Sequence, residues 1–241
     1  MKNQYFGDSR DLFKYDLVIS LMLDYNLSKN FIFVPMLTRD TGNSHGSITN
    51  YKIGKPGTKR PDLVAFLSDC LKRKKRDVNE IKGFFETNLA AEGLSINLYK
   101  RGDYFRDSFR EDYFNALPLE SAKRTIVMLD PDTGLETETY VRDKDAYLRY
   151  DEVKSIYDRL DNNSVLLLFQ FIPRVKRLPY IRSLCNRLTH ETGTKLPVNY
   201  VSDNSVVFFA LSKNIRNEKV LRKSLVDYGK RYDLIYGASR R

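Results

Sequence analysis

Carboxylates gather directly behind an apolar run in the middle of the chain, at Asp130-Pro131-Asp132. A carboxylate at a strand end accepts hydrogen bonds from an amine or a hydroxyl, and so does the main-chain carbonyl that precedes a proline. We expect this carbonyl to be unpaired at the rim of a sheet. Asp130, Pro131 and Asp132 are therefore candidate catalytic residues. The structural alternative is a reverse turn, since Asp-Pro followed by Gly134 is also typical of turns.

Polar or rigid residues also follow two other apolar runs. Thr38-Arg39-Asp40-Thr41-Gly42 comes after the run that ends at Leu37, and Pro173-Arg174 comes after the run 164–172. In open α/β sheets, ligands bind outside the carboxyl ends of the strands. If the three runs are neighbouring parallel strands, we expect Asp130 to face a cavity that it shares with the residues after position 37.

Apolar periodicity indicates the elements that position these residues. Helical spacing predicts helices over residues 11–26, from 61 to the basic run at 72–76, and over 78–89, 103–115, 150–160 and 180–191, with Asp11 as the cap of the first. Short apolar runs predict strands over residues 31–37, 95–99, 125–129, 164–172, 198–201 and 206–211. The segment at about 38–60, rich in Gly, Ser, Thr, Asn and Pro, is expected to be a long loop.

Strands that alternate with helices predict an α/β fold. We expect one Rossmann-like domain over residues 1–241, with a mostly parallel sheet and helices on both faces. The last two predicted strands flank a turn at Asp203-Asn204, which favours a C-terminal antiparallel hairpin.

The composition indicates a basic, folded protein. Hydrophobic residues make up 41% of the chain, and its formal net charge is +10. No apolar stretch reaches the roughly 18 residues that span a bilayer, and two cysteines are too few for a disulfide framework. We expect a cytoplasmic protein without a membrane partner. The positive charge favours nucleic acid as the partner, although it also serves to keep a surface soluble.

Two groups of basic residues are candidate contacts to nucleic-acid phosphates. Lys72, Lys74 and Lys75 belong to the basic run, and Arg174, Lys176 and Arg177 lie beyond a predicted strand end. The first group is equally typical of a solvated helix C-terminus.

The opening Gly7-Asp8-Ser9-Arg10-Asp11-Leu12-Phe13-Lys14-Tyr15 resembles the Gly-Asn-x-Ala-Asp-x-x-Lys-His opening of bacterial large-ribosomal-subunit RNA adenine-N6 methyltransferases. These are class I enzymes that use S-adenosylmethionine. Gly7, Asp11 and Lys14 match. Asp130-Pro131 resembles the first half of the family's Asp-Pro-Pro-Tyr motif, with Asp132-Thr133 in place of Pro-Tyr. The closing hairpin is similar to the end of the methyltransferase sheet.

The resemblance implies S-adenosylmethionine as the cofactor and a base amine of RNA or DNA as the target. Asp130 would accept a hydrogen bond from that amine, assisted by the carbonyl of Pro131. The positions expected to line the cofactor are Thr38, Asp40, Gly42, Asp103 and Lys14.

Two alternatives remain open. Pro131-Asp132 with Glu152-Val153-Lys154 imitates the Pro-Asp and Glu-x-Lys arrangement of Mg²⁺-dependent nucleases, in which Asp130, Asp132, Glu136 and Glu152 would hold the metal. That site needs a strand at residue 152, whereas the spacing there is helical. The other alternative is a catalytically inactive module that binds nucleic acid.

Overall fold

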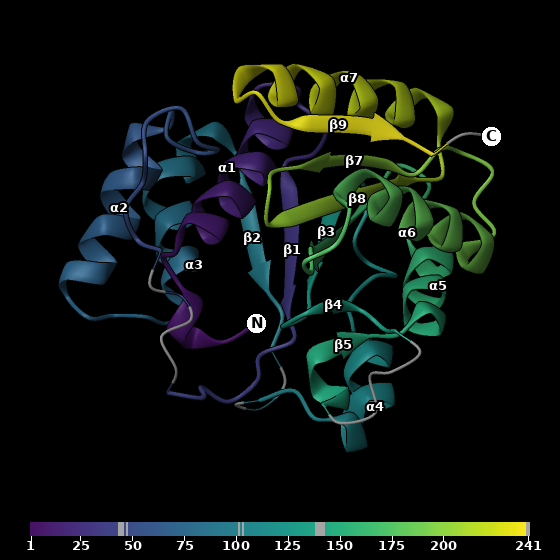
Figure 1. The fold of residues 1–241 in the computed structure, drawn as a ribbon, viewed down its shortest axis with the longest axis horizontal. Helices are drawn as coiled ribbons and strands as arrows, with labels where there is room; N and C mark the ends of the chain where they lie inside the picture. The colour runs from purple at the N-terminus through teal and green to yellow at the C-terminus, as the bar shows by residue number, and fades with distance from the viewer. Residues whose placement is uncertain (43–45, 47, 101, 103, 138–142, 240–241) are drawn as a thin grey trace.

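A seven-stranded sheet forms the centre of the molecule (Figure 1). The computed structural model describes residues 1–241 except 43–45, 47, 101, 103, 138–142 and 240–241. The strands lie in the order β2 (Ser95–Leu98), β1 (Asn30–Pro35), β3 (Thr125–Asp130), β6 (Val165–Phe171), β8 (Val206–Ser212), β7 (Asn199–Ser202) and β9 (Ile235–Ala238). The first four are parallel, and the last three join them through antiparallel pairs. The predicted mostly parallel α/β sheet with an antiparallel C-terminal hairpin is confirmed.

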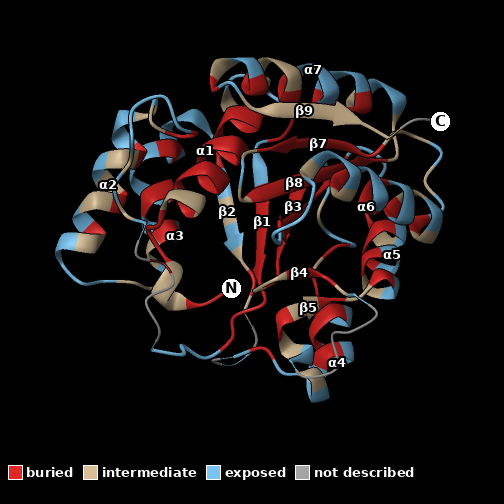
Figure 2. Ribbon diagram, in the orientation of Figure 1, coloured by how far each residue is buried: buried red, intermediate tan, exposed pale blue. Residues whose placement is uncertain are grey.

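Helices cover both faces of the sheet, as predicted. On one face lie α1 (Ser9–Leu23), α2 (Pro61–Lys72), α3 (Glu80–Phe84) and α7 (Ile215–Arg231); on the other lie α4 (Arg110–Asn115), α5 (Tyr150–Arg159) and α6 (Arg177–Thr192). Side chains of β3 alternate between the two cores, with Ile126 and Met128 on the first and Val127 and Leu129 on the second. Figure 2 shows the central strands buried between partly exposed helices, whereas the edge strands β2 and β9 are themselves partly exposed.

Helix α1 begins earlier than its apolar spacing predicts. Asp8, not Asp11, is its N-cap, because the Asp8 carboxylate accepts hydrogen bonds from the backbone N–H groups of Arg10 and Asp11. This places Asp11 inside the first helical turn, where it is buried.

The predicted helix over residues 103–115 is shorter than expected. The backbone N–H of Phe105 donates to Leu37 O at 2.7 Å, which holds this segment beside the chain that leaves β1. A short 3₁₀ turn at Asp107–Phe109 then leads into α4.

The predicted helix over residues 78–89 also differs, since α3 continues as a π-helical segment at Phe85–Leu89.

Two parts of the fold lie outside the sequence predictions. A small parallel sheet pairs β4 (Gly134–Leu135) with β5 (Tyr147–Leu148) and is attached to β6, because Gln170 Oε1 accepts a hydrogen bond from the backbone N–H of Leu135. The helix α7 and strand β9 complete the C-terminal end. Tyr228 of α7 donates its hydroxyl to Asp16 of α1 at 2.8 Å and stacks on Phe13.

Candidate functional site

The carboxyl ends of the central parallel strands meet at one edge of the sheet. Asp130 is the last residue of β3 and lies opposite Pro35, the last residue of β1. Only 1% of Asp130 is exposed. The prediction that Asp130 ends a middle strand, next to the strand that leads to position 37, is confirmed.

Lys14 reaches this edge from α1 and ties Asp130 to the helix. Its Nζ donates to Asp130 Oδ2 and to Asp11 Oδ1, both at 2.7 Å, and none of the three side chains is more than 3% exposed. Burial alone would lower the pKa of Lys14, but the two carboxylates outweigh burial and raise this pKa above its usual value. Lys14 is therefore a cation at neutral pH.

Four buried carboxyl groups and two lysines form one cluster here. We call Lys2, Asp8, Asp11, Lys14, Asp130 and Asp132 the buried charge cluster. Burial raises the pKa of Asp11 to about 7 against the attraction of Lys14, and burial also raises the pKa of Asp8. Moving each ion out of water costs several kcal/mol before its partners are counted, so such a cluster marks a candidate functional site.

Asp132 contributes a carboxylate oxygen that has no hydrogen-bond donor. Its side chain is 7% exposed, and Lys2 Nζ pairs with its Oδ2. The amine of Met1 lies 3.6 Å from Oδ1, but this oxygen accepts no hydrogen bond from any residue that the structure describes. Burial lowers the pKa of that amine to about 6, against the attraction of Asp132. The Asp132 oxygen is thus a buried acceptor without a hydrogen bond among the described residues, and the Met1 amine is the cation beside it.

The cavity beside the cluster is small. It has a volume of about 40 Å³, and Tyr5, Arg10, Pro131 and Phe171 are among its lining residues. This space suits water molecules and is too small for a nucleoside. None of the residues 38–42 lines this cavity, so it is not the cavity that the sequence predicts Asp130 to share with the residues after position 37.

The carbonyl of Asp130 differs from its sequence prediction. It was expected to be unpaired, but it accepts a hydrogen bond from the backbone N–H of Met36 at 3.1 Å. The cause is the register of β1 and β3, because the chain beyond Pro35 continues along β3 for one further residue.

The residues predicted to line the cofactor after β1 contact the first residues of the chain. The backbone N–H of Thr38 donates to Met1 O at 2.7 Å. Asp40 Oδ1 accepts from the backbone N–H of Gln4, and Gln4 Oε1 accepts from the N–H groups of Thr41 and Gly42. The remaining position, Asp103, lies outside the described residues. The described part of the predicted loop at about 38–60 contains no helix or strand.

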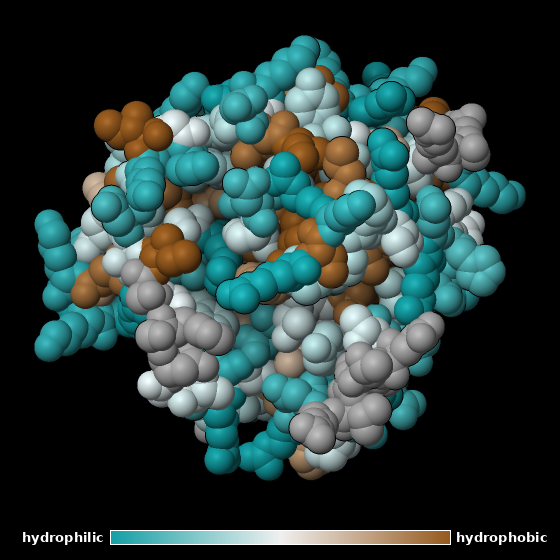
Figure 3. All heavy atoms as spheres, viewed as in Figure 1, coloured by the Kyte–Doolittle hydropathy of each residue, from teal (hydrophilic) through white to brown (hydrophobic). Residues whose placement is uncertain are grey.

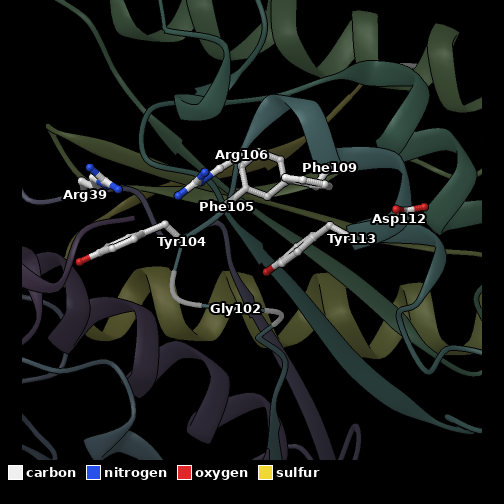
Figure 4. Close-up of a pocket in the computed structure, with 8 residues that line it drawn as sticks. All are labelled: Arg39, Gly102, Tyr104, Phe105, Arg106, Phe109, Asp112 and Tyr113. Atoms are coloured by element: carbon white, nitrogen blue, oxygen red, sulfur yellow. The ribbon is translucent and has the colours of Figure 1, made fainter.

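A larger pocket opens beyond the carboxyl ends of β1 and β2 (Figure 4). Its volume is about 420 Å³, and its lining is aromatic and cationic, consisting of Arg39, Gly102, Tyr104, Phe105, Arg106, Phe109, Asp112 and Tyr113. The guanidinium of Arg39 lies 5.7 Å from the ring centre of Tyr104. Tyr104 and Phe109 are 38% and 61% exposed, which is unusual for aromatic residues. We call this space the β1–β2 pocket.

The four carboxylates of the nuclease alternative have separate partners. Asp130 pairs with Lys14 and Asp132 with Lys2, whereas Glu136 accepts from the N–H of Tyr150 at 3.0 Å. Glu152 lies on helix α5 and pairs with Arg110. Among the described residues, no group of three His, Cys, Asp or Glu side chains is arranged to hold a metal ion. These residues do not fit Mg²⁺, and we derive no metal-dependent step from them.

The two predicted phosphate-binding groups lie on opposite faces of the sheet. Lys72 ends α2 on the first face, and Lys74 and Lys75 follow it; all three are exposed. Arg174 and Lys176 are exposed in front of α6, on the second face, where Arg177 donates to Asp203 O at 2.8 Å. The fold therefore does not join them into one basic surface.

Sequence reasoning missed Lys2, Asp8 and the aromatic residues of the β1–β2 pocket. One signal for the cluster was present, since Asp8, Asp11 and Lys14 recur every three residues at the start of a helix and so share one side of it. The contacts of Lys2 and Tyr104 depend on tertiary structure and leave no periodic signal.

Comparison with known protein families found no family model that matches this chain, and comparison with curated proteins found no match. Within the described residues, no helix has the length and apolar character needed to cross a bilayer.

Proposed function

We propose that this chain is an S-adenosylmethionine-dependent, methyltransferase-like protein that acts on a base amine of nucleic acid. The observation that carries the proposal is the position of Asp130, which ends the central strand β3 and is fixed there by Lys14. The resemblance of the opening residues adds to it. Asp11 and Lys14 are two of the three positions that match the opening motif of the methyltransferase family. They contact each other, and Lys14 also contacts Asp130.

The β1–β2 pocket supports a cofactor of this size and chemistry. A volume of about 420 Å³ falls within the roughly 300–1,000 Å³ of small-molecule sites. The exposed rings of Tyr104 and Phe109 suit an adenine, and the guanidinium groups of Arg39 and Arg106 suit a carboxylate. When bound, S-adenosylmethionine supplies an electrophilic methyl group.

The buried charge cluster would orient the amine that receives the methyl group. Asp132 Oδ1 is buried and has no hydrogen-bond donor among the described residues; once the side chains that cover it move aside, it would accept an amine N–H and direct the nitrogen lone pair away from the carboxylate. Lys14 holds Asp130 in one position, so the acceptor groups are preorganised before the target arrives.

Calorimetric titration with S-adenosylmethionine tests the cofactor. We expect the wild-type chain to bind it and Arg106→Gln to bind at least about tenfold more weakly, because a charge-assisted hydrogen bond is lost. Arg222→Gln, which changes an exposed arginine on α7, is the matched control and should bind normally. Absence of binding at millimolar cofactor would refute the proposal.

Methyl transfer to mixed RNA and DNA substrates tests the reaction. We expect Asp132→Asn to lose most of the transfer while it keeps its cofactor affinity. Circular dichroism checks that this variant is folded. If nucleic acid binds but no methyl group is transferred by the wild type, the chain is a binding module instead.

A further inference from the structure

A second pocket is lined by Ser9 and Leu12 of α1, the helix that also carries Asp11 and Lys14 of the buried charge cluster. Its volume is about 290 Å³, and Ser9 lines it while the neighbouring Asp8 and Arg10 line the small cavity at the cluster. Three segments far apart in the sequence form its walls, namely residues 48–58 after β1, residues 202–204 after β7 and residues 232–235 before β9. We call it the loop pocket.

Hydrogen bonds fix the walls of the loop pocket. The backbone N–H of Ser9 donates to Ile48 O at 2.9 Å, and Tyr51 Oη donates to Gly7 O at 2.6 Å. On the opposite wall, the Asp203 carboxylate accepts from the N–H groups of Ser205 and Val206 and so closes the β7–β8 turn. The pocket is therefore preformed, as small-molecule sites usually are.

The floor of the loop pocket is apolar and aromatic. Leu12, Pro56 and Leu234 line it together with Tyr51 and Tyr232. The hydroxyl of Tyr51 is bonded to Gly7 and that of Tyr232 to Asp16. Tyr232 is only 5% exposed and Lys59 Nζ lies 5.6 Å from its ring centre, so the half-buried Tyr51 offers the larger ring surface to the pocket. Such a floor fits a planar ring.

Two exposed lysines and the exposed Asp233 are among the charged residues that line the loop pocket. Lys52 and Lys55 are exposed, and no described residue forms an ion pair or hydrogen bond with either ammonium group. Arg177 also lines the pocket, but its guanidinium is engaged by Asp203 O and Asn204. A ring-binding floor below two available lysines matches a nucleotide, whose base is planar and whose phosphate is anionic.

We propose that the loop pocket receives one nucleotide of a single-stranded nucleic acid, with the base on the apolar floor and a phosphate on Lys52 and Lys55. This inference rests on the proposed function, because it identifies how the nucleic-acid substrate is held next to the buried charge cluster. It gives residues 48–58 of the long loop a part in holding the substrate, in addition to the cofactor contacts expected of Thr38, Asp40 and Gly42.

Fluorescence anisotropy with a short labelled single-stranded RNA tests the lysines. We expect the double variant Lys52→Gln/Lys55→Gln to bind at least about tenfold more weakly. The slope of its log affinity against log salt concentration should also be smaller, by the contribution of about two phosphate contacts. The matched control is Lys219→Gln/Lys223→Gln on the exposed side of α7, which removes the same charge. Equal losses in both double variants would overturn the proposal, because they would show only a general charge effect.

An RNA with abasic sites, of the same length and charge, tests the floor. We expect it to bind the wild type several-fold more weakly than the intact RNA, since the ring contacts are absent. Equal binding of the two RNAs would overturn the proposal.

Cofactor titration separates this inference from the proposed function. Lys52→Gln/Lys55→Gln should bind S-adenosylmethionine as the wild type does. If the wild type binds RNA through these lysines but never binds the cofactor, the methyltransferase proposal fails and the loop pocket stands. If the wild type binds the cofactor but Lys52→Gln/Lys55→Gln binds RNA as well as Lys219→Gln/Lys223→Gln does, the loop-pocket inference is refuted and the proposed function is not.

Discussion

At the scale of single residues, Lys14 neutralises two carboxylates in the interior of the protein. The rings of Tyr15, Phe33 and Phe169 surround its ammonium at 5.4–5.6 Å and add cation–π attraction. The aromatic contacts add to the attraction of Asp11 and Asp130, but without these two carboxylates they do not compensate the desolvation of the Lys14 ammonium. Removal of one charged residue from the cluster therefore leaves the desolvation penalty of its buried partners uncompensated.

Lys14→Met should be strongly destabilising. The substitution keeps most of the aliphatic chain but leaves Asp11 and Asp130 buried without their cation, which costs about 3–5 kcal/mol. Urea denaturation followed by circular dichroism measures the free energy of unfolding. Lys72→Met, at an exposed position on α2, should change it by less than about 0.5 kcal/mol. Similar losses for both variants would show that Lys14 has no special electrostatic role.

Asp11→Asn should change how stability depends on pH. The pKa of Asp11 is about 7 in the folded chain and near 3.8 when unfolded, so folding retains a proton between these values. This group therefore lowers the free energy of unfolding as the pH rises from about 4 to about 7. The variant lacks this loss, and its stability relative to the wild type should improve over that range.

Urea denaturation of both proteins at several pH values between about 4 and 8 measures this difference. Glu111→Gln, at an exposed position, is the control and should follow the wild type. A constant difference between Asp11→Asn and wild type across the range would contradict the raised pKa.

At the scale of the elements, sequence patterns predict the strands of the sheet better than the contacts at its edge. All six predicted strands exist, because alternating or continuous apolar runs require burial on one or two faces. Asp130 was located at the correct strand end for the same reason. The cap at Asp8 was missed, because the apolar spacing that suggested Asp11 does not include capping hydrogen bonds.

The elements that the sequence did not predict have polar patterns or depend on tertiary contacts. Helix α7 carries charges such as Arg216 and Lys223 along its exposed side, and its buried residues are spread between them. Strand β9 is only partly buried and forms because β7 offers it a free edge. The loop pocket is lined by residues 232–235, which connect α7 to β9, together with segments far away in the sequence, so no local pattern indicates the whole pocket.

Gly57→Ala should disturb the attachment of the long loop to α1. Gly57 has a φ of 87°, and a Cβ at this position would lie 2.4 Å from Leu12 Cγ. Gly54 has a φ of 85° but open space around it, so Gly54→Ala is a control with the same backbone strain and no clash. We expect Gly57→Ala to lose about 1–3 kcal/mol more than Gly54→Ala in thermal or urea unfolding. Equal losses in the free energy of unfolding would mean that the loop moves away from Leu12 without destabilising the protein.

At the scale of the whole molecule, positive charge is distributed rather than concentrated. The net charge is +10, and Figure 3 shows hydrophilic side chains spread over the whole face in view, with hydrophobic ones between them. The two groups of basic residues predicted from sequence lie on opposite faces of the sheet. One bound stretch of nucleic acid would therefore contact only one of these two basic groups.

Binding of nucleic acid should weaken steeply with salt. Each phosphate that the protein neutralises releases counter-ions, so a contact to about three or four phosphates of a single strand lowers affinity roughly 20- to 50-fold between about 50 and 200 mM salt. Anisotropy titrations over this range measure the slope. An affinity that is independent of salt would contradict an electrostatic contact to the phosphate backbone.

The pairing of α1 with α7 affects how the protein is made. Asp16 accepts hydrogen bonds from Tyr228 and Tyr232, which lie 212 and 216 residues later in the chain. On the ribosome, the first helix emerges long before these partners are synthesised. Until α7 is made, Asp16 has Arg60 as its ion-pair partner but lacks both tyrosine hydroxyls. Premature termination before α7 therefore yields a product without the helix that covers this part of the core.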